Sequence, residues 1–318
     1  MNKVKIVTYR VIAPVIVTCI AYFFYRSFHS NWTSIQTFRL NFNVAFIALS
    51  VLFTSSTYLL ATYSWTRLVN FLSGSPKLSY CEALAVVNTG NLTKYLPGKV
   101  WSYALQMYWL DKIGVKKSLI LYANIINLLI SITTSLLLGL LYLTVIRHTF
   151  HLPSVHLALA AIILADIFFI VSSHRLTRMV IFTTNKLFKQ DVEYYRMPSS
   201  LSLLLHLLNL LAAFCFGIGG YFLCKGIGFE IEPAVTLLIM SSMLISDVIG
   251  FLAIIIPGGL GVREGLMYLM LTGHSSQSLA LIIPVASRIV NMVVDLSLGL
   301  FSYLLLKKLL PRRYSAGS

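Results

Sequence analysis

The segment Ile254–Gly265 reads I-I-I-P-G-G-L-G-V-R-E-G and places a Pro-Gly break and an Arg-Glu pair inside a long apolar run. Breaks and charges are costly at membrane depth and usually mark function there. A helix that begins after such a break presents unpaired N–H groups and a partial positive charge, which suit phosphate. Arg263 could bind the same phosphate with its planar fork. The glycines that would let a ligand approach the backbone are Gly258, Gly259 and Gly261.

A second broken segment lies 160 positions earlier in the chain. Asn91–Ser102 reads N-L-T-K-Y-L-P-G-K-V-W-S, and Lys94 and Lys99 bracket its Pro-Gly break. These lysines could bind phosphate as Arg263 could. The candidate substrate-binding residues are Asn91, Lys94, Lys99, Gly258, Gly259, Gly261, Arg263, Glu264 and Arg288, and the candidate hinges are Pro97, Gly98 and Pro257.

Pairing within the protein is a competing interpretation of these charges. The Pro-Gly steps could simply kink helices, with Arg263 paired to Glu264 or Asp247. Asp295 lies two helical turns from Arg288 and could pair with it. Proton coupling is the functional alternative for the same carboxylates.

The composition indicates a polytopic α-helical membrane protein. The chain has 318 residues, of which 58% are hydrophobic and 11% are charged, with a mean hydropathy of +0.82. Soluble domains average about 45–50% apolar and about 25% charged residues. We expect a single membrane domain over residues 1–318, without a soluble catalytic domain, and therefore no enzyme. The sequence has no Cys-x-x-Cys pair and no nucleotide-binding glycine motif after a strand, so no metal or cofactor is expected.

Six apolar runs and two hairpins organise the chain. The arm Lys99–Leu110 has twelve residues and reaches roughly 18 Å, short of a hydrocarbon core of about 30 Å. This favours re-entrant hairpins over the alternative of eight full spans. The spans are expected near 10–25, 44–65, 118–146, 156–173, 200–224 and 279–306, and the hairpins over 78–110 and 233–271.

The basic residues predict the orientation. With the N-terminus inside, 17 Lys and Arg fall in inside loops and 4 outside, as the positive-inside rule expects. We therefore expect both termini to be cytoplasmic, in the inner membrane of a bacterium or archaeon. Orientation explains most of the net charge of +15, so nucleic acid is not an expected partner. The basic residues that orientation leaves unexplained are Lys94, Lys99, Arg263 and Arg288.

An internal repeat connects the two broken segments. A shift of 160 positions aligns Gly90 with Gly250 and Gly139 with Gly299, as well as the two Pro-Gly breaks. We interpret this as a duplication, with repeat one at about 10–146 and repeat two at about 156–307. Three spans per repeat is an odd number, so the second repeat would be inverted. Breaks at matching positions of inverted halves point to a transporter's binding site.

The two motifs together resemble the flippase-like membrane region of lysylphosphatidylglycerol synthases, which is also found in stand-alone proteins. The resemblance covers most of the chain and implies movement of an aminoacylated or other phospholipid between leaflets. The lipid-modifying members carry a soluble aminoacyl-transfer domain that this chain is expected to lack. The positions that match the motifs are Asn91, Pro97, Gly98, Pro257, Gly258, Gly259, Gly261 and Glu264.

The favoured hypothesis is a lipid translocator for an anionic or aminoacylated phospholipid or a polyprenyl-phosphate-linked lipid. Its partners would be membrane lipids with phosphate head groups, together with a second copy or a neighbouring membrane enzyme. One alternative is a membrane-embedded lipid-modifying transferase, although the longest inside loop offers only Asp191 and Glu193 as acids. The other alternative is a non-transporting partner of a membrane enzyme.

Overall fold

The computed structural model describes residues 41–74, 78–95, 101–146, 153–172, 178–179, 181–183, 186, 197–253 and 256–315. The regular structure of these residues is helical. The expected first span, 10–25, lies outside the described residues. Five described helices are long and apolar enough to cross a membrane. They are α4 (Val44–Leu72), α7 (Lys117–Val145), α10 (Ser199–Ile227), α11 (Pro233–Leu252) and α13 (Gln277–Ser315). Four of them correspond to predicted spans, the fifth, α11, is the first arm of the second predicted hairpin, and the predicted span 156–173 forms a shorter apolar helix instead.

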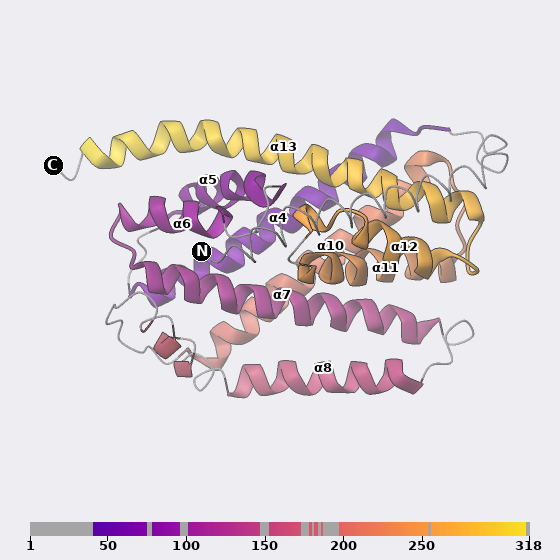
Figure 1. The fold of residues 1–318 in the computed structure, drawn as a ribbon, viewed down its shortest axis with the longest axis horizontal. Helices are drawn as coiled ribbons and strands as arrows, with labels where there is room; N and C mark the ends of the chain where they lie inside the picture. Colours follow the sequence, from indigo (N-terminus) through magenta and orange to yellow (C-terminus); the bar gives the residue numbers. More distant parts are fainter. Residues whose placement is uncertain are drawn as a thin grey trace, which may run out of the picture.

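Figure 1 shows α13 along one side of the molecule and the shorter apolar helix α8 (Pro153–Val171) along the other, with α4 and α10 crossing between α13 and α7. The α8 helix lies beside α7. A helix of 29 residues, such as α4, α7 or α10, is about 43 Å long, which exceeds the hydrocarbon thickness of about 30 Å. These helices therefore have the length to span a bilayer even when tilted.

Small residues bring α4 and α10 close together. A Cβ on Gly219 would lie 2.8 Å from the Thr54 hydroxyl, and the Ser50 hydroxyl donates to the Gly219 carbonyl at 2.7 Å. Glycine at such an interface lets two backbones approach and lets hydroxyls satisfy carbonyls in an apolar interior. At one end of the pair, the Asn43 N–H donates to the Gly226 carbonyl at 2.8 Å, which ties the start of α4 to the end of α10.

Two broken helix pairs occupy the regions of the expected hairpins. In the first pair, α5 (Tyr80–Asn91) continues into the 3-10 turn η2 (Leu92–Tyr95) and is followed by α6 (Trp101–Asp111). In the second pair, α11 leads to η3 (Pro257–Gly259) and then α12 (Val262–Leu271). In each pair the second helix packs against the first. With 12, 11 and 10 residues, α5, α6 and α12 are about 15–18 Å long and too short to cross a bilayer alone.

The last long helix of each predicted half packs against the broken helix of the other predicted half. The α7 helix packs on α11, where the Ser241 hydroxyl donates to the Gly139 carbonyl at 2.8 Å. The α13 helix packs on α5, and Gly299 lies against Leu92 of η2. The aligned glycines, Gly139 and Gly299, thus both lie at an interface between the halves. This exchange is consistent with the predicted duplication.

The two breaks themselves meet. Figure 1 places α5 and α6 toward one end of the molecule and α11 and α12 toward the other, and η2 lies against η3 between them. The described interior has one apolar cluster on each side of this region. Buried apolar residues of α7 from Leu119 to Ile130 belong to the first cluster, and those from Leu138 to Leu143 belong to the second.

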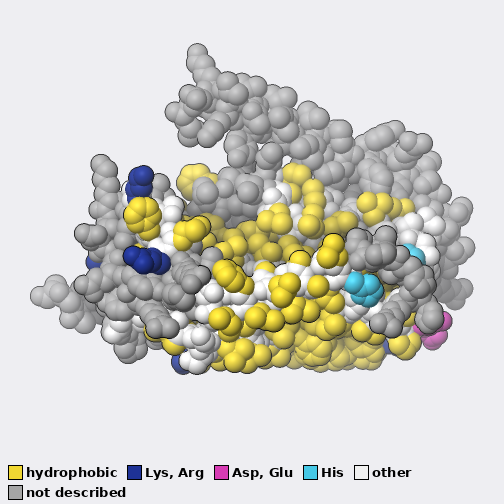
Figure 2. Space-filling view, turned by 90° about the horizontal axis from the view of Figure 1, so that it is seen from below, with side chains coloured by type: hydrophobic (Ala, Val, Ile, Leu, Met, Phe, Trp, Pro, Cys, Tyr) yellow, Lys and Arg dark blue, Asp and Glu magenta, His cyan; other side chains and the backbone are white. Residues whose placement is uncertain are grey.

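The outer surface is apolar as well. Figure 2 shows hydrophobic side chains across the face seen from below, with Lys and Arg at one end. Exposed side chains of α8 include Leu157, Leu164 and Phe168. A helix that exposes large apolar side chains along its length has the surface expected next to lipid.

Candidate functional site

Three glycines shape the second break. Gly258, Gly259 and Gly261 have φ of 60°, 65° and 78°, a region in which side chains with a Cβ are strained. A Cβ on Gly259 would lie 2.5 Å from the carbonyl oxygen of Gly250, and a Cβ on Gly250 would lie 3.0 Å from the Cβ of Arg263. The absence of a Cβ at Gly250 and Gly259 therefore lets the break and the start of α12 fold back onto α11. Packing explains Gly259 without a ligand.

The first break has an equivalent feature. A Cβ on Gly90 would lie 2.8 Å from the Ser102 hydroxyl. Gly90 therefore lets α6 pack closely against α5, as Gly250 lets α12 pack closely against α11. The two glycines are the pair that the shift of 160 positions aligns. Nearby, the Asn91 amide contacts the Asn88 amide at 3.5 Å. Asn91 therefore lies at the end of α5, beside the break.

The start of α12 is capped by the protein's own carboxylate. The Gly261 N–H donates to Glu264 Oε2 at 2.5 Å, and Glu264 is buried. A carboxylate in the first helical turn satisfies an N–H group and interacts favourably with the helix dipole. The position predicted to bind a phosphate is therefore occupied by Glu264 in this structure.

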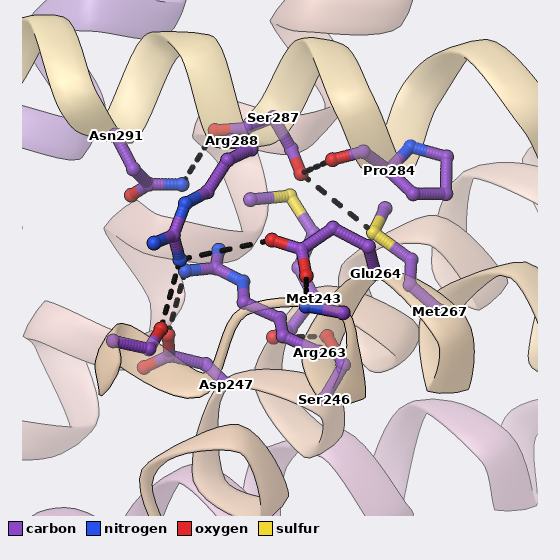
Figure 3. A network of polar contacts seen from close by, with 12 residues as sticks. Met243, Ser246, Asp247, Arg263, Glu264, Met267, Pro284, Ser287, Arg288 and Asn291 are labelled. Atoms are coloured by element: carbon purple, nitrogen blue, oxygen red, sulfur yellow. Dashed lines mark hydrogen bonds and ion pairs between the residues drawn. The ribbon is translucent and has the colours of Figure 1, made fainter. Parts of the chain in front are cut away.

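Arg288 ties this capped break to α13. Its Nη1 donates to the Gly258 carbonyl at 2.9 Å and lies 3.6 Å from Glu264 Oε1 (Figure 3). The Arg288 and Glu264 side chains are only 12% and 9% exposed. A buried charge pair with an added backbone contact fixes the relative positions of the elements that carry it.

Arg263 points to a different partner. Its Nη1 lies 2.8 Å from Asp247 Oδ1 of α11, and the centre of its guanidinium is 5.3 Å from the Phe216 ring centroid. The Arg263 side chain is 9% exposed, whereas that of Asp247 is 53% exposed. Arg263 Nε and Nη2 are buried and have no hydrogen-bond partner in the described part of the chain. Of the two internal pairings open for Arg263, the structure contains the one with Asp247.

Tyr58 and Asp295 complete the cluster from the neighbouring helices α4 and α13. The Tyr58 hydroxyl lies near the Asp295 carboxylate and within electrostatic range of Asp247 and Arg263. Asp295 is 3% exposed. We call Tyr58, Asp247, Arg263, Glu264, Arg288 and Asp295 the charged cluster.

The charged cluster brings together Arg263, Glu264 and Arg288 of the predicted site. Its two guanidiniums, from Arg263 and Arg288, face three carboxylates. The other predicted cations cannot be placed here, because the Lys94 side chain and all of Lys99 lie outside the described residues, as do Pro97, Gly98 and the Pro257 ring. The proximity of Lys94 and Arg263 therefore stays a prediction, although η2, which contains the Lys94 backbone, lies against η3.

Sequence reasoning missed two members of this region, Tyr58 and Phe216. Neither stands out among the aromatic residues of an apolar span, so no sequence signal identified them. It also missed a separate buried pair in which His206 Nε2 lies 3.6 Å from Asp166 Oδ1, between α10 and α8. Asp166 carried a signal, since it is the single acidic residue of an apolar helix of 19 residues.

Long apolar helices, two broken helix pairs and a charged interior define a multi-pass helical membrane protein. The family model of the lysylphosphatidylglycerol synthase TM region matches residues 10–299, and the chain therefore belongs to this family. This confirms the resemblance seen in the two motifs. Comparison with curated proteins and with solved structures gave no match.

Proposed function

We propose that this protein is a lipid translocator that moves a phosphate-bearing lipid between the leaflets of the membrane. The observation that carries the proposal is Arg263, a buried guanidinium beside the meeting point of two helix breaks. One edge of its fork has no hydrogen-bond partner among the described residues. Charged residues inside membrane bundles typically line substrate pathways. The anionic or aminoacylated phospholipids and polyprenyl-phosphate-linked lipids share the phosphate that such a fork would bind.

The family supports a lipid-related membrane role, and the chemistry of the interior favours transport. The head group would cross beside the charged cluster, while its acyl or prenyl tails stay in the bilayer next to the apolar outer surface. This division matches the lipid's own division into a charged and an apolar part. It also avoids the cost of moving an unpaired phosphate through hydrocarbon.

The proposed architecture has two inverted halves, each with three spans and a re-entrant broken pair. The short helices α5, α6 and α12 and the contact between η2 and η3 support it. The packing of α7 on α11 and of α13 on α5 supports interlocked halves. The 20-residue α11 is long enough to cross the membrane, which is what the alternative of eight full spans requires.

We further propose that both termini are cytoplasmic and that the membrane is the inner membrane of a bacterium or archaeon. Described basic residues gather at the end of the molecule where α6 leads into α7. Lys112, Lys116 and Lys117 lie there, and Lys307 lies near the end of α13, whose Leu306 joins the same apolar cluster as Leu119. This asymmetry is the one that the positive-inside rule associates with the cytoplasm.

The proposal is tested by reconstitution in liposomes with head-group-labelled lipids. The panel contains anionic phospholipids, an aminoacylated phospholipid and a polyprenyl-phosphate sugar, and a membrane-impermeant reductant reports which leaflet holds the label. Wild-type protein should accelerate the exchange of at least one of these lipids. Arg263→Gln should slow that exchange about tenfold or more, because a charge-assisted contact contributes about 1.5–3 kcal/mol. Lys225→Gln, which removes a basic residue from the end of α10, is the matched control and should exchange lipid normally.

Two outcomes would overturn the proposal. Wild-type protein that moves none of the panel lipids is not a translocator of this class. Equal rates of lipid exchange for the wild type and Arg263→Gln would show that the charged cluster does not take part in transport. Tolerance of Arg263 and Glu264 substitutions, together with loss of function on changing outer helix faces, would instead indicate a non-transporting partner.

A further inference from the structure

The ion pair between Arg263 and Asp247 is asymmetric. Its cationic member is buried, with 9% of the side chain exposed, whereas its anionic member is 53% exposed. One oxygen of Asp247 lies 2.8 Å from Arg263 Nη1. A half-exposed carboxylate can leave such a pair and be solvated, but a buried guanidinium cannot leave and needs an anion.

Arg263 is held in place independently of Asp247. The Arg263 Cβ packs so closely against Gly250 that a side chain at position 250 would not fit. The Arg263 guanidinium lies beside the Phe216 ring. Nε and Nη2, which form one edge of the planar fork, are buried without a hydrogen-bond partner in the described structure. The guanidinium therefore contacts Asp247 through one nitrogen, while its other two nitrogens have no acceptor among the described residues. This geometry allows a second anion to bind to both of these nitrogens.

The second arginine of the charged cluster is engaged differently. Arg288 contacts both the Gly258 carbonyl and Glu264, and Glu264 also accepts the Gly261 N–H. The Arg288 and Glu264 side chains are both nearly buried. Displacement of Glu264 from Arg288 by a ligand would leave the break uncapped and two buried charges unpaired. Arg288 and Glu264 therefore stabilise the structure of the break.

We propose that Asp247 is a displaceable counter-ion, which holds Arg263 until the phosphate of a lipid takes its place. The inference rests on the proposed function and assigns the first contact of the lipid phosphate to Arg263 alone. The phosphate replaces Asp247 at Nη1 from the exposed side, Asp247 turns outward, and the buried Nε and Nη2 then complete the contact. The resting protein thereby avoids an unpaired buried charge, and the cost of breaking the pair favours ligands that carry a full phosphate charge.

Binding of phosphatidylglycerol to the purified protein in nanodiscs tests the exchange directly. Asp247→Asn removes the competing charge, so its affinity for this lipid should rise about tenfold, the factor expected for loss of a charge-assisted contact of modest strength. Glu232→Gln removes an exposed carboxylate from the start of the same helix and should leave the affinity unchanged. In the double variant Asp247→Asn with Arg263→Gln, the gain should disappear and the affinity should equal that of Arg263→Gln.

Carbodiimide labelling of wild-type protein provides a second readout that needs no substitution. A carboxylate released from its ion pair reacts faster, so phosphatidylglycerol should increase the modification of Asp247 at least twofold, measured by mass spectrometry. Diacylglycerol, which has the tails without the phosphate, should not. An equal increase with inorganic phosphate alone would overturn the assignment to a lipid in favour of a soluble anion.

The two proposals fail in different ways. If wild-type protein moves no lipid in liposomes, the translocator proposal fails. If it moves lipid, but Asp247→Asn binds phosphatidylglycerol no more tightly and labelling of Asp247 does not respond to it, the counter-ion exchange is wrong.

Discussion

Arg288 of α13 donates from Nη1 to the carbonyl oxygen of Gly258 at 2.9 Å, across 30 positions of the chain. This contact joins a long helix to the tip of a glycine break, where the backbone has few other ways to satisfy its carbonyl groups. Glu264 lies 3.6 Å from the same nitrogen and caps α12. The stability of the break therefore depends on one guanidinium supplied by another helix.

Replacing Arg288 by Gln should lower the free energy of unfolding by about 3 kcal/mol, because it leaves Glu264 as a buried charge without its partner. Thermal unfolding of the purified protein measures this loss. Lys307→Gln, on the exposed end of the same helix, should change stability by less than about 0.5 kcal/mol. Equal melting temperatures for the two variants would show that Arg288 does not hold the break.

Gly259→Ala should be far more costly than Gly273→Ala, although both glycines have positive φ, of 65° and 85°. Gly273 has open space where a Cβ would lie, so its substitution should cost about 1–2 kcal/mol of backbone strain alone. Gly259 would also collide with the Gly250 backbone at 2.5 Å. We expect at least about 2 kcal/mol beyond the cost at Gly273, from comparison of chemical unfolding of the two variants. A difference near zero would contradict the close packing of the break on α11.

Two glycine-to-alanine substitutions within helices should have opposite effects. Gly265→Ala in α12 meets nothing within 4 Å and should stabilise the protein by about 0.5–1 kcal/mol through helix propensity. Gly299→Ala gains the same propensity, but its Cβ would collide with Leu92, so it should destabilise by about 1–3 kcal/mol. Melting curves distinguish the signs. Stabilisation by both substitutions would be incompatible with the close contact between α13 and η2.

The buried pair of His206 and Asp166 should show energetic coupling. The His206 ring is fixed by a 2.7 Å contact between Nδ1 and the Ser202 carbonyl, which turns Nε2 toward Asp166. A double-mutant cycle of His206→Gln and Asp166→Asn should give a coupling energy of about 1–3 kcal/mol in unfolding experiments. The cycle of His206→Gln with Glu232→Gln provides the control, for which we expect additivity. A coupling energy below about 0.5 kcal/mol would mean that the pair does not fasten α8 to α10.

Apolar length predicted four of the five described long helices as spans, whereas α11 was predicted as the arm of a hairpin. The expected spans 118–146 and 200–224 correspond to α7 and α10, which end within a few residues of the predicted bounds. The end of α10 lies three residues beyond the predicted bound of 224, at Ile227, where Gly228 adopts φ of 91°. The two Pro-Gly motifs also identified the family over residues 10–299.

The sequence by itself determined where helices run and where they break, because apolar run length and glycine or proline placement act through local geometry. It could not determine which charges meet. Arg263 pairs with Asp247 from the other side of the break, and Arg288 contacts Gly258 and Glu264. Asp295 lies near Tyr58 of a helix more than 200 positions away. These partners are chosen by the packing of five helices around the two breaks. Only that tertiary packing decided that carboxylates face both Arg263 and Arg288, and that Arg263 Nε and Nη2 find no hydrogen-bond partner among the described residues.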